Sequence, residues 1–144
     1  TMYFADSDPG IVHAFAFDGK RGTISQARVL IDATDEQGKP DGLTVDSAGD
    51  LWVAMWGIGS VRRYGPDGML RQELAIPAAQ TTSCAFAGPG LHRLYVTTAT
   101  EDWTEDQRRA DPAAGLLYRL DTDATGRAAE TFRPDPSWWS QALR

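Results

Sequence analysis

The residue best suited to carry chemistry in this 144-residue sequence is an aspartate, Asp41, in the segment Pro40-Asp41-Gly42-Leu43-Thr44-Val45-Asp46. A carboxylate at a binding site can accept a proton from a reacting group. Pro-Asp-Gly is also a favoured turn tripeptide, and Asp67 in Pro66-Asp67-Gly68 is expected to form only a turn. Both interpretations of Asp41, functional carboxylate and turn residue, stay open until the elements around it are placed.

Other catalytic arrangements are missing from the sequence, which has no Gly-x-Ser-x-Gly elbow, no His-x-x-x-His pair and no Cys-x-x-Cys pair. A serine triad or a histidine-rich zinc site within this chain is therefore not expected. The one cysteine, Cys84, lies in the run Thr82-Ser83-Cys84-Ala85-Phe86. With no basic partner nearby to activate its thiol, Cys84 is expected to be a small buried residue rather than a nucleophile.

Composition excludes two classes of partner. The formal charge is -6, with 20 acidic against 14 basic residues, so the chain lacks the concentrated positive field that a nucleic-acid binder needs. No apolar run reaches the roughly 20 residues of a membrane-spanning helix, and no membrane partner is expected. A single cysteine cannot form an internal disulfide and is compatible with a reducing compartment. A cytoplasmic location is the expectation, with any signal peptide lying upstream of Thr1.

The elements that must position Asp41 are short strands that repeat. An aliphatic, aromatic, apolar, small pattern occurs at Met2-Tyr3-Phe4-Ala5, Leu51-Trp52-Val53-Ala54 and Leu94-Tyr95-Val96-Thr97. A second run follows each copy and ends in a turn, and a third run is expected at residues 27–31, 70–76 and 127–132. Two copies also have a preceding apolar run, at residues 43–45 and 83–86. Four strands in each period of roughly 40 to 50 residues are typical of propeller blades.

The sequence therefore predicts an all-β fold, a β-propeller with three four-stranded blades of which the first is incomplete. A β-sandwich with coincidental spacing is the alternative. The expected blades span residues 1–38 (partial), 39–79 and 80–133, with a tail at 134–144. Because three blades cannot close a ring of roughly four to eight, the chain is expected to be the C-terminal half of a six-bladed propeller. It then needs a missing N-terminal half, or a second copy of itself, to close the ring.

Alternation of strand direction brings one set of connections to a single face, at the central channel. These connections are expected at residues 6–10, 39–42, 56–60, 80–83 and 98–115. The last is far longer than a turn requires, and its charged residues can form a rim or lid, or merely a solvated excursion. The residues in question are Glu101, Asp102, Trp103, Glu105, Asp106, Arg108 and Arg109. Candidate rim residues for a substrate are Trp56, Thr82, Ser83 and Thr98.

Two segments carry a family resemblance beyond the strand pattern. The first is residues 40–46, continued by Gly49-Asp50-Leu51-Trp52-Val53-Ala54-Met55-Trp56-Gly57 and then by Val61-Arg62-Arg63-Tyr64. The second is Thr81-Thr82-Ser83-Cys84-Ala85-Phe86-Ala87-Gly88 with residues 94–99. Together with the opening strand they closely resemble the regucalcin/gluconolactonase (senescence marker protein 30-like) family, in order and at family spacing over residues 1–121.

This resemblance implies a six-bladed propeller that hydrolyses a sugar lactone with one divalent metal ion in its channel. It implies that Asp41 is a metal ligand and also a catalytic residue, able to take the proton from water. The other family ligands, a glutamate and an asparagine, would lie upstream of Thr1, so this chain alone is expected to be inactive. Ca²⁺, Zn²⁺, Mg²⁺ and Mn²⁺ all fit the expectation.

Two alternatives to a lactonase are a non-catalytic propeller that binds a ligand or protein through its channel face, and a half-propeller that dimerises. The pair Trp138-Trp139 in the tail is expected to pack beneath the last blade or to cover a partner surface.

Overall fold

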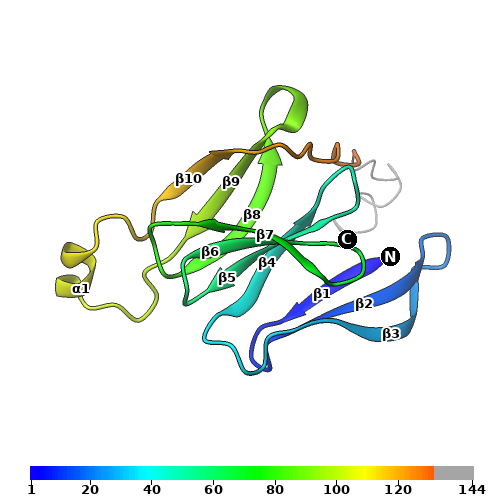
Figure 1. The fold of residues 1–144 in the computed structure, drawn as a ribbon, viewed down its shortest axis with the longest axis horizontal. Helices are drawn as coiled ribbons and strands as arrows, with labels where there is room; N and C mark the ends of the chain where they lie inside the picture. The colour runs from blue at the N-terminus through cyan, green and yellow to red at the C-terminus, as the bar shows by residue number, and fades with distance from the viewer. Residues whose placement is uncertain (132–144) are drawn as a thin grey trace, which may run out of the picture.

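A computed structural model describes residues 1–131 and arranges them in three antiparallel sheets (Figure 1). The sheets have the strand orders β1-β2-β3, β4-β5-β6-β7 and β10-β9-β8. The strands are β1 (Met2–Asp6), β2 (Ile11–Asp18), β3 (Thr23–Asp32), β4 (Lys39–Val45), β5 (Leu51–Trp56), β6 (Ser60–Tyr64), β7 (Leu70–Ala75), β8 (Thr81–Ala87), β9 (Arg93–Thr98) and β10 (Leu117–Asp121). A 3₁₀ turn, η1 (Pro89–Leu91), and one helix, α1 (Glu105–Ala110), complete the described elements.

The core lies between the sheets, and β5 belongs to both halves of it. Residues Leu51 to Met55 are all fully buried, because β5 is an interior strand covered on both faces. Alternate side chains of β5 go to opposite sides. Leu51, Val53 and Met55 pack against the first sheet, whereas Trp52 packs against the third. The central sheet is therefore fixed by its neighbours on each side, and β4 contacts both β1 and β8.

The predicted fold class is confirmed, since each repeat becomes a meander of antiparallel strands and the second repeat forms a complete four-stranded blade. One predicted strand is wrong. Residues 127–131 form no strand, and Phe132 lies outside the described residues, as does the pair Trp138-Trp139. The backbone of Thr125 instead accepts a hydrogen bond from Ser47 N (2.8 Å), and Gly126 N donates to Leu91 O (2.8 Å). The bond from Ser47 ties the chain after β10 to the central blade, and the bond to Leu91 ties it to η1.

A buried charged cluster fixes the end of the central blade where β4 stops. Asp46 accepts hydrogen bonds from the backbone N–H of Asp50 (2.9 Å) and from Trp52 Nε1 (3.0 Å). Asp50 in turn accepts from Arg63 Nε and Arg71 Nη1, both at 2.8 Å. Arg63 also lies over the Trp52 ring, 5.3 Å from its centroid. Both carboxylates are almost fully buried, so their partners satisfy charges that would otherwise be costly to remove from water.

The long connection between β9 and β10 contains α1, which strand-like patterns do not predict. Its N-terminus carries a capping box, in which Gln107 N donates to the Thr104 hydroxyl and Thr104 N donates to the Gln107 side chain. Figure 1 shows this helix projecting from the end of the sheets. Within residues 1–131, no helix has the length and apolar character needed to cross a membrane.

Candidate functional site

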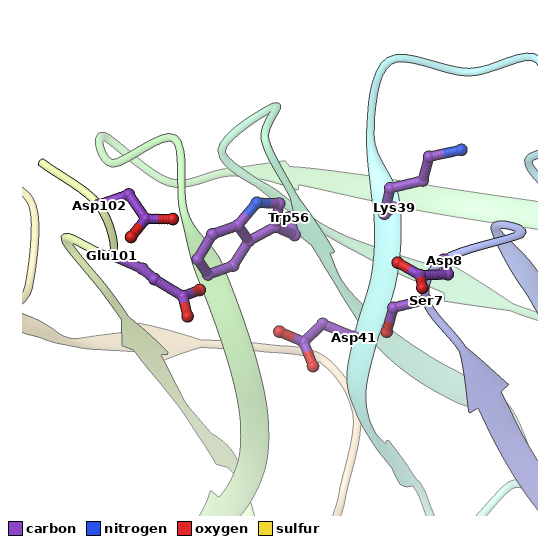
Figure 2. Close-up of a pocket in the computed structure, with 7 residues that line it drawn as sticks. All are labelled: Ser7, Asp8, Lys39, Asp41, Trp56, Glu101 and Asp102. Carbon is purple, nitrogen blue, oxygen red and sulfur yellow. The ribbon is translucent and has the colours of Figure 1, made fainter.

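A cavity of about 440 Å³ opens at the end of the sheets opposite the Asp46 cluster. Two connections and two strand ends meet there: the connection after β1, the long loop after β9, the start of β4 and the end of β5. The lining residues are Ser7, Asp8, Lys39, Asp41, Trp56, Glu101 and Asp102 (Figure 2). The predicted convergence is therefore present in part: the connections at residues 6–10 and 98–115 meet at the cavity together with the adjoining ends of β4 and β5.

Asp41 reaches the cavity from an irregular strand, not from a loop. The expectation that residues 39–42 form a connection is wrong, because β4 already begins at Lys39. Pro40 is opposite Met55 and Leu43 is opposite Val53, so Asp41 and Gly42 together face one residue, Ala54. Such a β-bulge kinks a strand and changes the direction of a side chain, and bulges are frequent next to functional sites. Pro40 is tolerated here because β4 is the edge strand of its sheet.

Gly42 is required by the close approach of the third sheet. A Cβ at this position would lie 2.5 Å from the Cβ and 2.8 Å from the Cα of Ser83. The neighbouring Thr81 is fully buried, and its hydroxyl donates to the backbone oxygens of Met55 (2.6 Å) and Ser60 (3.2 Å). The two blades therefore meet tightly beside Asp41, which holds this wall of the cavity in place.

The predicted rim residues are divided by the structure. Trp56 lines the cavity together with Asp41, whereas Thr82, Ser83 and Thr98 are not among its lining residues. The Thr82 hydroxyl pairs with that of Thr97 at 2.6 Å. Thr98 Oγ1 donates to Leu116 O at 2.7 Å, and Ser83 packs against Gly42. These three side chains therefore make contacts within the third sheet or between it and the central sheet.

Sequence reasoning placed Glu101 and Asp102 in a rim loop but did not single out Ser7, Asp8 or Lys39. The structure assigns all five to the cavity wall. The available signal was position, since Ser7 and Asp8 follow β1 and Lys39 begins β4 at the face where the connections converge. Nothing in the residue types alone distinguishes them from ordinary turn residues.

The chemical groups in the cavity are four carboxylates, one hydroxyl, one ammonium and one indole. Burial raises the pKa of Asp41 above its usual value; the Gly42 N–H opposes this effect and the nearby charge of Glu101 adds to it. Figure 2 shows the carboxylates of Asp41 and Glu101 directed toward each other, with the Trp56 ring beside them. The excess of negative charge makes the cavity attractive to a cation.

Histidine and cysteine do not contribute to this cavity: His13 lies in β2, His92 follows η1, and Cys84 is buried in β8. Among residues 1–131, no three His, Cys, Asp or Glu side chains are grouped closely enough to hold a metal ion by themselves. The oxygen donors present fit a hard divalent ion. This chain can supply one part of such a ligand set, with Asp41 as its most enclosed member in the wall.

Known proteins resemble this chain in sequence. The chain is 40% identical over 138 residues to a pentonolactonase of Haloferax volcanii and 39% identical over 136 residues to an L-arabinolactonase of Azospirillum brasilense. These alignments cover 93% and 94% of this chain but 47% and 44% of those proteins. The chain thus spans about half the length of the curated relatives it matches.

Solved structures agree with these relatives. A regucalcin from Agrobacterium tumefaciens, described as a calcium-binding protein, matches with a TM-score of 0.86 and 36% identity, over 92% of this chain and 45% of that one. Residues 1–100 match the protein family described as the SMP-30/Gluconolactonase/LRE-like region. The β4 segment with its bulged Asp41, the β5 run and the β8 segment all fall within that match. The chain therefore belongs to the SMP-30/gluconolactonase/LRE-like family.

Proposed function

We propose that the protein containing this chain is a metal-dependent lactonase that opens sugar lactones, and that Asp41 is a catalytic residue and a metal ligand of its site. The observation that carries this proposal is the position of Asp41, on a bulge near the start of β4 and in the wall of the cavity between the connections after β1 and β9. Two relatives are named for pentonolactones and L-arabinolactone, which supports a sugar lactone as substrate.

The proposed reaction needs few groups. Water attacks the lactone carbonyl, the bond from the carbonyl carbon to the ring oxygen breaks, and that oxygen takes up a proton to leave a hydroxy acid. The carboxylate of Asp41 accepts the proton of the attacking water. Tight packing of Gly42 against Ser83 holds the Asp41 carboxylate at the cavity wall. The proton acceptor is therefore already positioned before the lactone binds.

A bound divalent ion would polarise the carbonyl and make water more acidic. The described residues that line the cavity offer carboxylate and hydroxyl oxygens and neither imidazole nor thiolate, which favours Ca²⁺, Mg²⁺ or Mn²⁺ over Zn²⁺. The calcium-binding regucalcin among the structural relatives supports a hard ion. The remaining ligands and part of the sugar pocket come, in this proposal, from blades outside this chain.

The proposed assembly is a closed ring in which this chain supplies a partial blade at residues 1–38 and blades at residues 39–79 and 80–133. The other blades belong to an N-terminal half or, alternatively, to a second copy of the chain. The relatives' greater length favours an N-terminal half. Sedimentation of the chain in isolation tests this, because a stable, folded dimer would favour the second copy.

The test compares two Pro-Asp-Gly aspartates in the full-length protein. Asp41→Asn is expected to lower kcat/KM for an aldonolactone by at least about 100-fold, since a positioned proton acceptor contributes about 10²-fold or more. Asp67→Asn changes the same tripeptide in an exposed turn between β6 and β7 and is expected to leave kcat/KM unchanged. Acid release is followed with a pH indicator, with and without a chelator.

Equal activity of the Asp41→Asn and Asp67→Asn proteins would contradict the role of Asp41. A wild-type protein that binds a sugar lactone but never opens it would instead favour the non-catalytic binding module. Activity that survives complete removal of divalent ions would contradict the metal dependence.

A further inference from the structure

The backbone of Glu101 is held by a side chain from another connection, the glutamine that precedes β8. Gln80 Nε2 donates to Glu101 O at 3.0 Å, and Glu101 N donates to Gln80 Oε1 at 2.7 Å. The oxygen and the nitrogen of the Gln80 carboxamide therefore both bond to the backbone of Glu101. The backbone of Gln80 is fixed as well, because it bridges Trp56 and accepts a hydrogen bond from Ala99 N at 2.9 Å.

The loop on either side of Glu101 is tightly turned. Asp102 has a φ of 58°, a left-handed conformation that is uncommon for residues other than glycine. Trp103 N donates to Thr100 O at 3.3 Å across this turn, and Arg108 Nη2 reaches the same oxygen at 3.4 Å. The turn places the Glu101 carboxylate in the cavity wall, opposite Asp41 and beside the Trp56 ring.

A carboxylate beside an aromatic ring suits one kind of ligand particularly well. Ring hydroxyls of a sugar donate strong hydrogen bonds to a charged oxygen acceptor. The C–H face of the same ring packs against an indole, which combines an apolar surface with rigidity. Glu101 and Trp56 present these two features side by side, and Gln80 contacts both residues. Among the described lining residues, an anionic ligand would meet four carboxylates and one ammonium.

We propose that Glu101 is a specificity-determining residue that binds the hydroxyl groups of a neutral, polyhydroxylated lactone, with Trp56 against the face of the sugar ring and Gln80 as the positioning residue. This inference rests on the proposed function and adds the substrate feature that the site reads. It separates the work of the two facing carboxylates: Asp41 handles the proton of water, and Glu101 holds the sugar.

The test uses the full-length protein and three ligands: an aldonolactone, δ-valerolactone, which has the ring ester but no hydroxyls, and 1,5-anhydro-D-glucitol, which has the ring hydroxyls but no ester. Glu101→Ala is expected to raise KM for the aldonolactone about tenfold, the loss expected for a hydrogen bond to a charged group, with kcat nearly unchanged. Turnover of δ-valerolactone should not change. The Kd for 1,5-anhydro-D-glucitol, measured by calorimetry, should rise about tenfold.

Two further variants sharpen the result. Gln80→Leu removes both bonds to the Glu101 backbone and should raise KM for the aldonolactone in the same way. Combined with Glu101→Ala it should add little, because the two changes act on one contact. Glu105→Gln, an exposed change on α1 in the same loop, is the matched control and should match wild type in every assay.

The outcomes separate this inference from the proposed function. A fall in kcat on both lactones in Glu101→Ala would make Glu101 part of the reacting machinery and overturn its assignment to the sugar. Unchanged binding of 1,5-anhydro-D-glucitol would overturn it as well. A wild-type protein that opens neither lactone would refute the proposed function, while a tenfold loss of 1,5-anhydro-D-glucitol binding in Glu101→Ala would still support the sugar contact.

Discussion

Replacing Asp46 with alanine should be among the most destabilising single changes in the central blade. The carboxylate is 1% exposed and accepts three hydrogen bonds, from the backbone N–H of Ala48 (3.0 Å) and Asp50 (2.9 Å) and from Trp52 Nε1 (3.0 Å). The last two donors are buried and would lose their partner. At about 1–3 kcal/mol for each buried donor left unsatisfied, the free energy of unfolding should fall by about 2–6 kcal/mol.

A graded series makes this prediction specific. Asp46→Asn keeps one oxygen acceptor for the backbone donors and is expected to lose about half as much stability as Asp46→Ala. Asp67→Ala is the matched control, because Asp67 also bonds a backbone N–H two residues on, that of Met69 at 3.1 Å, but does so at the exposed surface. It should cost less than about 1 kcal/mol.

The measurement is urea unfolding of the full-length protein, followed by tryptophan fluorescence. The free energy of unfolding is obtained by linear extrapolation, and the m-values of variant and wild type are compared. A loss in Asp46→Ala no larger than that in Asp67→Ala would refute the reasoning. It would mean that water accepts hydrogen bonds from the freed N–H donors.

Two further changes test the packing of the third sheet. Gly42→Ala should reduce the free energy of unfolding by about 1–3 kcal/mol, the usual cost of overpacking, because its Cβ would lie 2.5 Å from the Cβ of Ser83. Combining it with Ser83→Gly should recover part of this loss in the same urea assay. An unchanged stability of Gly42→Ala would contradict the close contact. Cys84 should resist alkylation at pH 8 in the folded protein and react when unfolded, because burial raises the pKa of its thiol to about 12; rapid stoichiometric labelling of the folded state by a thiol reagent would show that it is accessible after all.

Local patterns predicted the strands well because each blade is a meander of neighbours in sequence. The recurring runs beginning at Met2, Leu51 and Leu94 correspond to β1, β5 and β9. The strand expected at residues 127–132 failed for a long-range reason, since Ser47 and Leu91 capture the backbone of Thr125 and Gly126. Helix α1 was not predicted because six residues are too few to show a helical period. Thr104 and Gln107, three residues apart, do match the sequence pattern of a capping box.

The candidate site was partly visible for the same reason. Asp41 stood out by its place before an apolar strand, and the length of the loop after β9 drew attention to Glu101. The sequence could not show the bulge that directs Asp41, because pairing register depends on β5. Nor could it show the Gln80 clamp on Glu101, which joins residues 21 positions apart. The same holds for the cluster of Asp46, Asp50 and Arg63. It forms only when the connection from β4 to β5 packs against β6.

The bulge at Asp41 has a counterpart one blade further on. In β8, Thr81 is opposite Thr98 and Ser83 is opposite Thr97, so Thr82 is an extra residue at the corresponding end of the next innermost strand. Blades that arose by duplication would inherit such an extra residue together with the strand. In each blade this extra residue, Asp41 in β4 and Thr82 in β8, is a position where the side chain can change without a change in chain length.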